Sequence, residues 1–192
     1  MPLIALSEVI DAAIMTLAIG FIFSDVFPRR QEGYDPLARR QRFGFIDWEA
    51  LKYGAMAAAP GVILHELAHK FVAMSFGLEA TFHAAYFWLV IGVALKLARF
   101  PFVFFVPGYV SYLAAGTPLQ DGLIALAGPA TNLVLWLGSW YLLTAGGKKF
   151  RKYRVLLYLN KQINMFLFIF NILPIPGFDG GHVFSNLLQA FR

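Results

Sequence analysis

The sequence predicts an all-α polytopic membrane protein with about five to six transmembrane helices. Hydrophobic residues make up 59% of the 192 residues and charged residues only 14%, whereas soluble domains have about 45–50% and about 25%. The apolar residues gather in long segments, and a helix that crosses a bilayer needs about 20 of them. Most basic residues lie in two short runs beside these segments, as in loops that flank a membrane. The net charge of +5 therefore gives no indication of nucleic acid binding.

The two basic runs predict the orientation of the chain. One run contains Arg29, Arg30, Arg39, Arg40 and Arg42, and the other contains Lys148, Lys149, Arg151, Lys152 and Arg154. The positive-inside rule places both runs in the cytoplasm, so an even number of crossings lies between them. We expect a multi-pass protein of the cell membrane, embedded in the lipid bilayer.

The first half of the chain divides into two expected spans and a loop. Residues 3–27 are apolar and form the first span, and residues 28–48 form a polar loop. Residues 50–77 form the second span, which Gly77 ends because glycine commonly follows the last residue of a helix.

The middle section, residues 80–119, leaves alternatives open. It is aromatic and β-branched, it contains several Pro and Gly residues, and Lys96 and Arg99 interrupt its most apolar part. It allows one span over 84–106, a hairpin, or a re-entrant element. Irregular backbone at membrane depth is tolerated only where protein or a water-filled cavity covers it.

The last third of the chain contains three apolar segments. Residues 120–144 and 155–173 are expected to be helices, separated by the polar break at 148–154. Residues 179–191 are apolar but short for a full span, which needs about 20 residues.

The second expected span contains a His-Glu-x-x-His motif, His65-Glu66-Leu67-Ala68-His69. Residues four apart lie on one face of a helix, so both imidazoles can reach one metal ion. Glu66 lies beside them, where a carboxylate can activate a water molecule for hydrolysis. A chance match is the competing interpretation, because single short motifs carry false positives.

A third metal ligand has to come from elsewhere, because catalytic zinc usually has three protein ligands. The chain has no cysteine, so only His, Asp and Glu can supply it. A carboxylate at membrane depth is costly and usually functional. Glu66 and Asp179 are the two that stand in apolar context beside other polar groups, and His182 is the other candidate ligand. A helix cap is the competing interpretation of Asp179.

Three motifs in order give most of the chain a resemblance to the site-2 protease family of intramembrane zinc metalloproteases. The first is the His-Glu-x-x-His motif, the second resembles the family's Gly-Pro-x-x-Asn, and the third resembles its Asn-x-x-Pro-x-x-x-x-Asp-Gly. These motifs are found at His65 to His69, Gly128 to Asn132 and Asn171 to Gly180. Three motifs on three apolar segments are far more specific than a single one.

The resemblance implies a role for each matching residue at the metal. His65, His69 and Asp179 are expected to hold one Zn²⁺ per chain, and Glu66 is expected to be the general base. Asn132 is expected to be catalytic, near the metal, where it holds the substrate backbone or the oxyanion. An interhelical hydrogen bond, which membrane helices use widely, is the alternative role of Asn132.

The resemblance also implies how the substrate is held. Asn171 is expected to position the substrate or to orient the helix break. Gly108 and Tyr109 stand in a section that resembles the family's membrane-embedded strand region, where an extended substrate can pair by strand addition. We therefore expect a re-entrant or strand-containing segment between the metal-motif helix and the Gly-Pro-x-x-Asn helix.

The sequence departs from the family pattern in three places. Phe178 stands where many members have Leu, and His182 stands where Arg is common, so a metal role for His182 stays open. Residues 84–100 resemble an insertion before the strand region. We expect no PDZ or CBS domain within the chain.

Together these features predict a single transmembrane protease domain over residues 1–192. Residues 1–49 are expected to be a peripheral helix and polar loop, and 50–192 the catalytic core. The expected activity is hydrolysis of a peptide bond within or near the transmembrane segment of a membrane-protein substrate, in regulated intramembrane proteolysis. The alternative is a non-catalytic zinc-binding membrane protein or a metal transporter. Glu66 argues against metal storage, and the lack of an internal repeat argues against a transporter.

Overall fold

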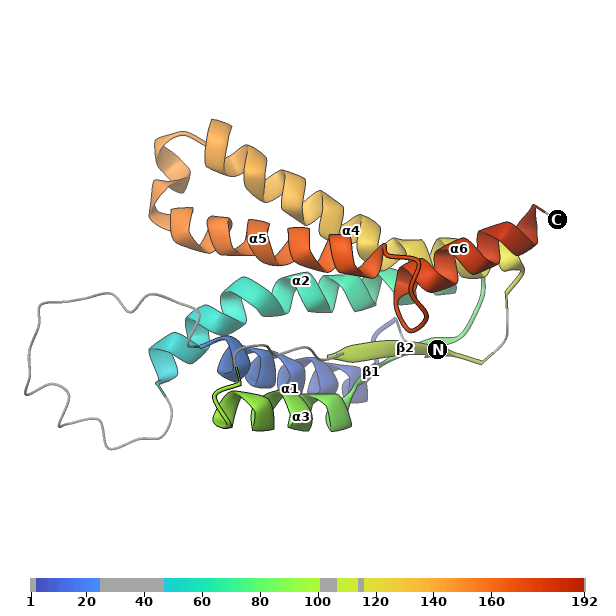
Figure 1. The fold of residues 1–192 in the computed structure, drawn as a ribbon, viewed down its shortest axis with the longest axis horizontal. Coiled ribbons are helices and arrows are strands. Elements are labelled where there is room, and N and C mark those ends of the chain that lie inside the picture. Colours follow the sequence, from blue (N-terminus) through green and yellow to red (C-terminus); the bar gives the residue numbers. More distant parts are fainter. Residues whose placement is uncertain (1–2, 25–46, 101–106, 114–115, 192) are drawn as a thin grey trace, which may run out of the picture.

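The computed structural model describes residues 3–24, 47–100, 107–113 and 116–191. Most of the polar loop expected at 28–48, and the segment 101–106, lie outside these residues. The described chain is mostly helical, with one small antiparallel sheet (Figure 1). Its elements in order are α1 (Leu6–Phe23), α2 (Trp48–Ser75), β1 (Ala80–Ala84), α3 (Tyr86–Leu97), β2 (Gly108–Tyr112), α4 (Pro118–Ala145), the 3₁₀ helix η1 (Lys148–Tyr153), α5 (Arg154–Asn171) and α6 (Asp179–Ala190).

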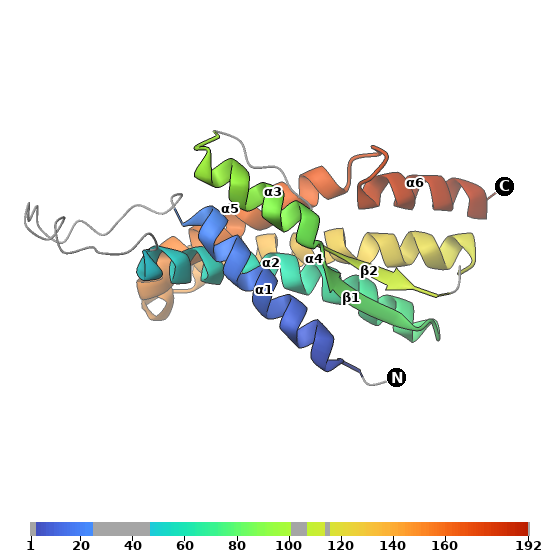
Figure 2. The same ribbon diagram turned by 90° about the horizontal axis from the view of Figure 1, so that it is seen from below.

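The helix α2 lies in the middle of the molecule. On one side it packs against α4 and α5, which form an antiparallel pair, and on the other side it packs against α1 (Figure 1). The short helix α3 lies next to α1, and the view from below shows both in front of α2 (Figure 2). The last helix, α6, packs against α4. This arrangement surrounds the His-Glu-x-x-His motif of α2 with other elements.

The expected helices are confirmed, with ends within a few residues of the predicted ones. Among the described residues, α1 and α4 are long and apolar enough to cross a membrane. The helix α2 is equally long but carries four charged side chains, among them Glu66 and Lys70. The predicted total number of spans stays a prediction.

Local sequence signals account for the ends of α2 and α4. The Asp47 carboxylate accepts a hydrogen bond from the Ala50 amide and caps the start of α2, a role for which aspartate is preferred. Gly77 follows the end of α2 with a φ of +80°, which glycine adopts without steric cost. The stop predicted at Gly77 is therefore confirmed. Thr117 and Gln120 cap the start of α4 reciprocally.

Two glycines let α1 and α2 approach closely. A Cβ atom at Gly20 would lie 2.8 Å from the Leu51 carbonyl oxygen, and one at Gly54 would meet the Gly20 carbonyl oxygen. Beside this crossing, the core contains Met15 and Ile19 of α1, both fully buried. The first helix is therefore packed into the body of the protein.

The middle section forms a pair of strands with a helix between them. β1 and β2 pair antiparallel, from Ala80 opposite Tyr112 to Ala84 opposite Gly108. Alternate residues of β1 are buried, as expected for a strand with one face on the core. The strand-containing segment is confirmed. Of the range 84–106 the structure describes 84–100, in which Ala84 ends β1 and α3 ends at Leu97, so a single span over 84–106 stays a prediction.

Candidate metal centre

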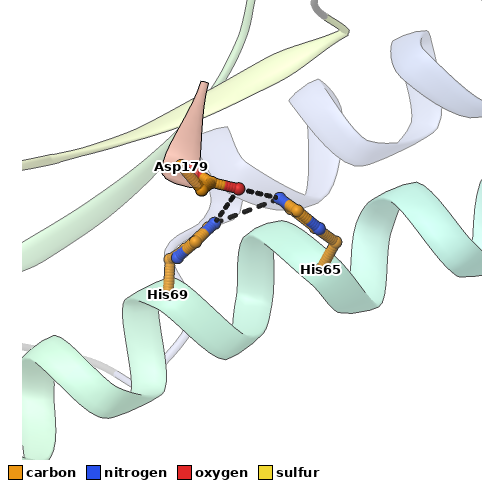
Figure 3. Close-up of side chains that lie close together, drawn as sticks. All are labelled: His65, His69 and Asp179. Carbon is orange, nitrogen blue, oxygen red and sulfur yellow. Dashed lines mark hydrogen bonds and ion pairs between the residues drawn. The ribbon is translucent and has the colours of Figure 1, made fainter. Parts of the chain in front are cut away.

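Three side chains from two helices lie close together (Figure 3). His65 and His69 lie one turn apart on α2, and their Nε2 atoms are 3.1 Å apart. Asp179, the first residue of α6, places its Oδ2 atom 3.0 Å from Nε2 of His65 and 3.4 Å from Nε2 of His69. In the part of the chain that the structure describes, these residues form the one group of His, Asp or Glu that could hold a metal ion.

Hydrogen bonds on the far side of each imidazole fix its orientation. His65 Nδ1 is 2.6 Å from Oδ1 of Asn132, and His69 Nδ1 is 2.6 Å from the carbonyl oxygen of Ile124. Because both partners are oxygen acceptors, each Nδ1 donates and each Nε2 keeps its lone pair. Two imidazole lone pairs and a carboxylate oxygen therefore point toward one another, and a bound cation would stabilise this arrangement.

One face of α4 supports both imidazoles. Ile124, Gly128 and Asn132 follow one another at intervals of four residues, and the first and last contact the two imidazoles. Gly128 lies between them, and a Cβ atom there would meet Nε2 of both His65 and His69. The missing side chain at Gly128 therefore lets the backbone of α4 lie directly against both imidazoles.

The distances fit zinc in a tetrahedral site. Ligand atoms about 2.1 Å from zinc at tetrahedral angles lie about 3.4 Å from one another. The three separations between Nε2 of His65, Nε2 of His69 and Oδ2 of Asp179 are 3.0, 3.1 and 3.4 Å. Two His and one carboxylate are a common ligand set of catalytic zinc, which leaves the fourth position for water or substrate.

The break between α5 and α6 brings Asp179 to the two imidazoles. Gly177 has a φ of +93°, and a Cβ atom at Gly180 would meet the backbone of Ile172. These glycines allow α6 to begin close against the end of α5. His182, the other candidate ligand, is exposed and lies outside the metal group.

Glu66 is buried beside the metal group without belonging to it. The side chain is 7% exposed, and its carboxylate is close enough to His65, His69 and Asp179 to interact with all three electrostatically. A buried carboxylate is costly unless a nearby cation offsets its charge. This position fits the base expected at Glu66.

Asn132 is fully buried and belongs to a chain of amide side chains. Its Nδ2 atom donates to the Gly61 carbonyl at 3.1 Å and to Oδ1 of Asn164 at 2.9 Å. Nδ2 of Asn164 in turn donates to the carbonyl and the side-chain oxygen of Asn160. Asn132 Oδ1 is thereby directed at His65. The described contacts make Asn132 an outer support of the metal site, and its contact with substrate or oxyanion stays a prediction.

The three predicted substrate residues lie apart from the metal group. Asn171 is the last residue of α5, and Gly108 and Tyr109 are the first two residues of β2. Gly108 is buried and Tyr109 is 53% exposed, with its ring against that of His83. No described contact joins these residues to the ligands, so their roles stay predictions.

Two groups of polar residues that are buried or half-buried are not predicted from the sequence. Asn160 and Asn164 lie one turn apart in an apolar helix, and this spacing is the signal that could have revealed them. Glu8 and Lys70 form a buried ion pair between α1 and α2. Glu8 looks like a polar residue at the end of a span, and only its partner shows that it points inward.

The fold and the site define a helical zinc metalloprotease, and comparisons with known proteins agree. Residues 146–192 match the model of peptidase family M50. A protein of Methanocaldococcus jannaschii, named as a zinc metalloprotease, is 37% identical over 183 residues, which is 92% of this chain and 82% of that protein. The chain therefore belongs to peptidase family M50, the site-2 protease family.

A second relative is longer than this chain. A protein of Synechocystis, also named as a zinc metalloprotease, is 28% identical over 159 residues, or 81% of this chain and 36% of that protein. No solved structure matches the chain significantly. The protein is thus a zinc metalloprotease, and the metal expected in the group formed by His65, His69 and Asp179 is zinc.

Proposed function

We propose that this protein is an intramembrane protease. It hydrolyses a peptide bond within or near the transmembrane segment of a membrane-protein substrate, as a step of regulated intramembrane proteolysis. The observation that carries the proposal is the position of the metal group, whose two histidines are buried in α2 and whose partly exposed Asp179 comes from α6. Two of the helices that pack against α2, namely α1 and α4, are apolar and long enough to cross a bilayer.

The residues of the site divide the chemical work. His65, His69 and Asp179 would hold the zinc ion, which when bound supplies a Lewis acid that polarises the scissile carbonyl. Glu66 takes a proton from the attacking water and later passes it to the leaving amine. Asn132 keeps the proton of His65 on Nδ1, so that Nε2 remains a ligand.

The substrate binds in an extended form along β2. In the antiparallel pair, the odd-numbered residues of β2 face β1, as the flanking bonds Ala85 to Pro107 and Leu113 to Glu79 indicate. The amide and carbonyl groups of Gly108, Val110 and Tyr112 therefore point to the opposite edge. No strand of the described chain pairs with that edge.

Strand pairing would supply hydrogen-bond partners to the peptide groups of an unwound transmembrane substrate. A transmembrane helix satisfies its peptide groups internally, and unwinding leaves them without partners in lipid. Pairing with β2 gives these groups new partners while the scissile bond is presented to the metal group. The hairpin packs against α2, which carries His65, Glu66 and His69.

Cleavage of a model substrate tests the proposal. Wild type and Glu66→Gln are reconstituted in liposomes with a single-helix membrane protein that carries an epitope at each end and a Gly-Pro break in its helix. We expect wild type to cleave within or near the helix, and Glu66→Gln to retain zinc but to lose cleavage by at least about 100-fold.

The same experiment separates the proposal from its alternatives. Equal zinc content in both proteins, with cleavage confined to soluble loops, would contradict intramembrane hydrolysis. Zinc transport into the liposomes that is unaffected by Glu66→Gln would favour the transporter. No observation in the described structure favours the transporter or the non-catalytic protein.

A further inference from the structure

A second group of buried charges lies outside the metal group, between α1, α2 and β1. Lys70 Nζ is 2.5 and 2.6 Å from the two carboxylate oxygens of Glu8, and both side chains are at most 3% exposed. A buried ion pair is favourable only when further hydrogen bonds satisfy its remaining lone pairs. Glu8 accepts two such bonds, from the Ala5 amide at 2.6 Å and from the Phe82 amide at 2.8 Å. Phe82 is the central residue of β1.

Asp11 repeats this contact one turn later. Its Oδ2 atom accepts a hydrogen bond from the Ala84 amide at 3.2 Å, and its Oδ1 atom accepts one from the Tyr86 hydroxyl. Residues three apart share a face of a helix, and residues two apart in a strand direct their amides to the same edge. The carboxylates of Glu8 and Asp11 therefore accept hydrogen bonds from the amides along one edge of β1.

The pair of β1 and β2 is thus tied to α1 through the edge of β1, while no strand of the described chain pairs with the other edge of β2. β1 lies between the carboxylates of α1 and the strand β2, whose other edge carries the polar groups of Gly108, Val110 and Tyr112. Lys70 directly follows the ligand His69, so the ion pair also joins β1 to the metal-binding turn of α2. One cluster of contacts connects the free edge of β2 with the position of the metal.

We propose that Glu8 and Asp11 are positioning residues for the substrate. They fix β1 relative to the metal-binding turn of α2, and through β1 they fix the edge of β2 on which the substrate pairs. A preorganised edge reduces the ordering cost when an extended peptide binds. The inference rests on the proposed function in one respect, namely that the substrate pairs with β2.

A merely structural ion pair would stabilise the packing of α1 on α2 without any role in substrate binding. The two roles differ in one atom pair, the Glu8 oxygen that accepts from the Phe82 amide. A matched pair of double variants isolates it. Glu8→Gln with Lys70→Met removes the ion pair but keeps an acceptor for the Phe82 amide. Glu8→Leu with Lys70→Met removes both, and neither variant leaves a buried charge unpaired.

The kinetic experiment uses the zinc-loaded full chain and the substrate described above, in liposomes. We expect KM of the leucine variant to exceed KM of the glutamine variant by about fivefold, the effect of one hydrogen bond between neutral groups. The values of kcat are expected to differ by less than about twofold, because the metal site is intact. Equal KM values, or a change confined to kcat or to zinc content, would overturn the proposal.

A second matched pair and a second readout guard against variants that fold poorly. Asp11→Asn keeps an acceptor for the Ala84 amide, whereas Asp11→Leu removes it. In zinc-loaded protein, we expect amide hydrogen exchange across 80–84 and 108–112 to be at least about tenfold faster in each leucine variant than in its amide control. Equal exchange would overturn the positioning role even if no substrate is cleaved. Faster exchange with unchanged KM would overturn the role in substrate binding alone.

Discussion

At the metal centre, one carboxylate of α6 completes a ligand set that α2 begins. His65 and His69 are held by hydrogen bonds to α4, whereas Asp179 depends on where α6 starts. The carboxylate contributes both a ligand atom and the negative charge that offsets the charge of the metal. Its loss therefore affects the metal more than the loss of an outer support.

We predict that Asp179→Ala loses zinc affinity by more than about 100-fold, which is the upper end of the effect of outer partners. Competition with a chelator of known affinity measures it. His182→Ala is the matched control, since this exposed residue follows one turn later on the same helix and lies outside the metal group. Full zinc affinity in Asp179→Ala, with a loss in His182→Ala, would reverse the assignment.

A chain of hydrogen-bonded amide side chains supports His65 from the side away from the metal group. Asn164 fixes the orientation of Asn132 because it accepts from Nδ2 of Asn132 and donates through its own Nδ2 to Asn160. Asn132 can then present only its oxygen to His65. The amide chain thereby fixes the orientation of Asn132, and Asn132 in turn fixes the tautomer of His65.

We predict that Asn164→Leu weakens zinc binding by about tenfold, at the low end of the effect of outer partners. Ser139→Ala is the control, because Ser139 donates to Asn160 at the far end of the chain. Asn164→Leu loses three side-chain hydrogen bonds and Ser139→Ala loses one, so both melting temperatures fall, that of Asn164→Leu further. Zinc competition is expected to separate them, and equal zinc affinities would show that the chain only stabilises the helices.

At the scale of elements, α4 supports the metal site through Gly128, which has no side chain. Gly128 brings the backbone of α4 against the two imidazoles, and a Cβ atom there would collide with Nε2 of both and displace them. Gly138 lies in the same helix, and a Cβ atom there would have nothing within 4 Å. A side chain is therefore tolerated at Gly138 but not at Gly128.

We predict that Gly128→Ala abolishes stoichiometric zinc binding, while Gly138→Ala retains it. In the second variant the replacement should stabilise the helix by about 0.5–1 kcal/mol, because glycine is unfavourable within a helix. Metal analysis of the purified proteins, with thermal unfolding of each, checks both statements. Stoichiometric zinc in Gly128→Ala would mean that α4 can move away from α2.

Local spacing predicts some of this architecture and fails for the rest. A helical period places His65 and His69 on one face whatever the rest of the chain does, and the Pro and Gly residues after Asn171 predict the break before Asp179. The contacts of Asn164 and Glu8 depend on how one helix crosses another, which no short segment determines. The pairing of β1 with β2 across α3 is equally non-local. The sequence therefore leaves a hairpin and a single span as alternatives.

At the scale of the whole molecule, the second basic run lies at one end of the described bundle, in η1 (Figure 1). The start of α2, which follows the first basic run in the chain, lies at the same end as η1, which carries the second run (Figures 1 and 2). The turn between α2 and β1 lies at the opposite end. This arrangement agrees with the even number of crossings expected between the basic runs.

We predict that both basic runs face the cytoplasm. The chain has no cysteine, so single cysteines can be introduced as Glu32→Cys and Lys149→Cys and tested with a membrane-impermeant maleimide. In intact cells both positions should stay unlabelled, and both should react after the membrane is permeabilised. Glu79→Cys, at an exposed position near the opposite end, serves as the comparison. If only one of the two basic positions reacts in intact cells, an odd number of crossings separates them, and the middle section between α2 and α4 would then cross the membrane once.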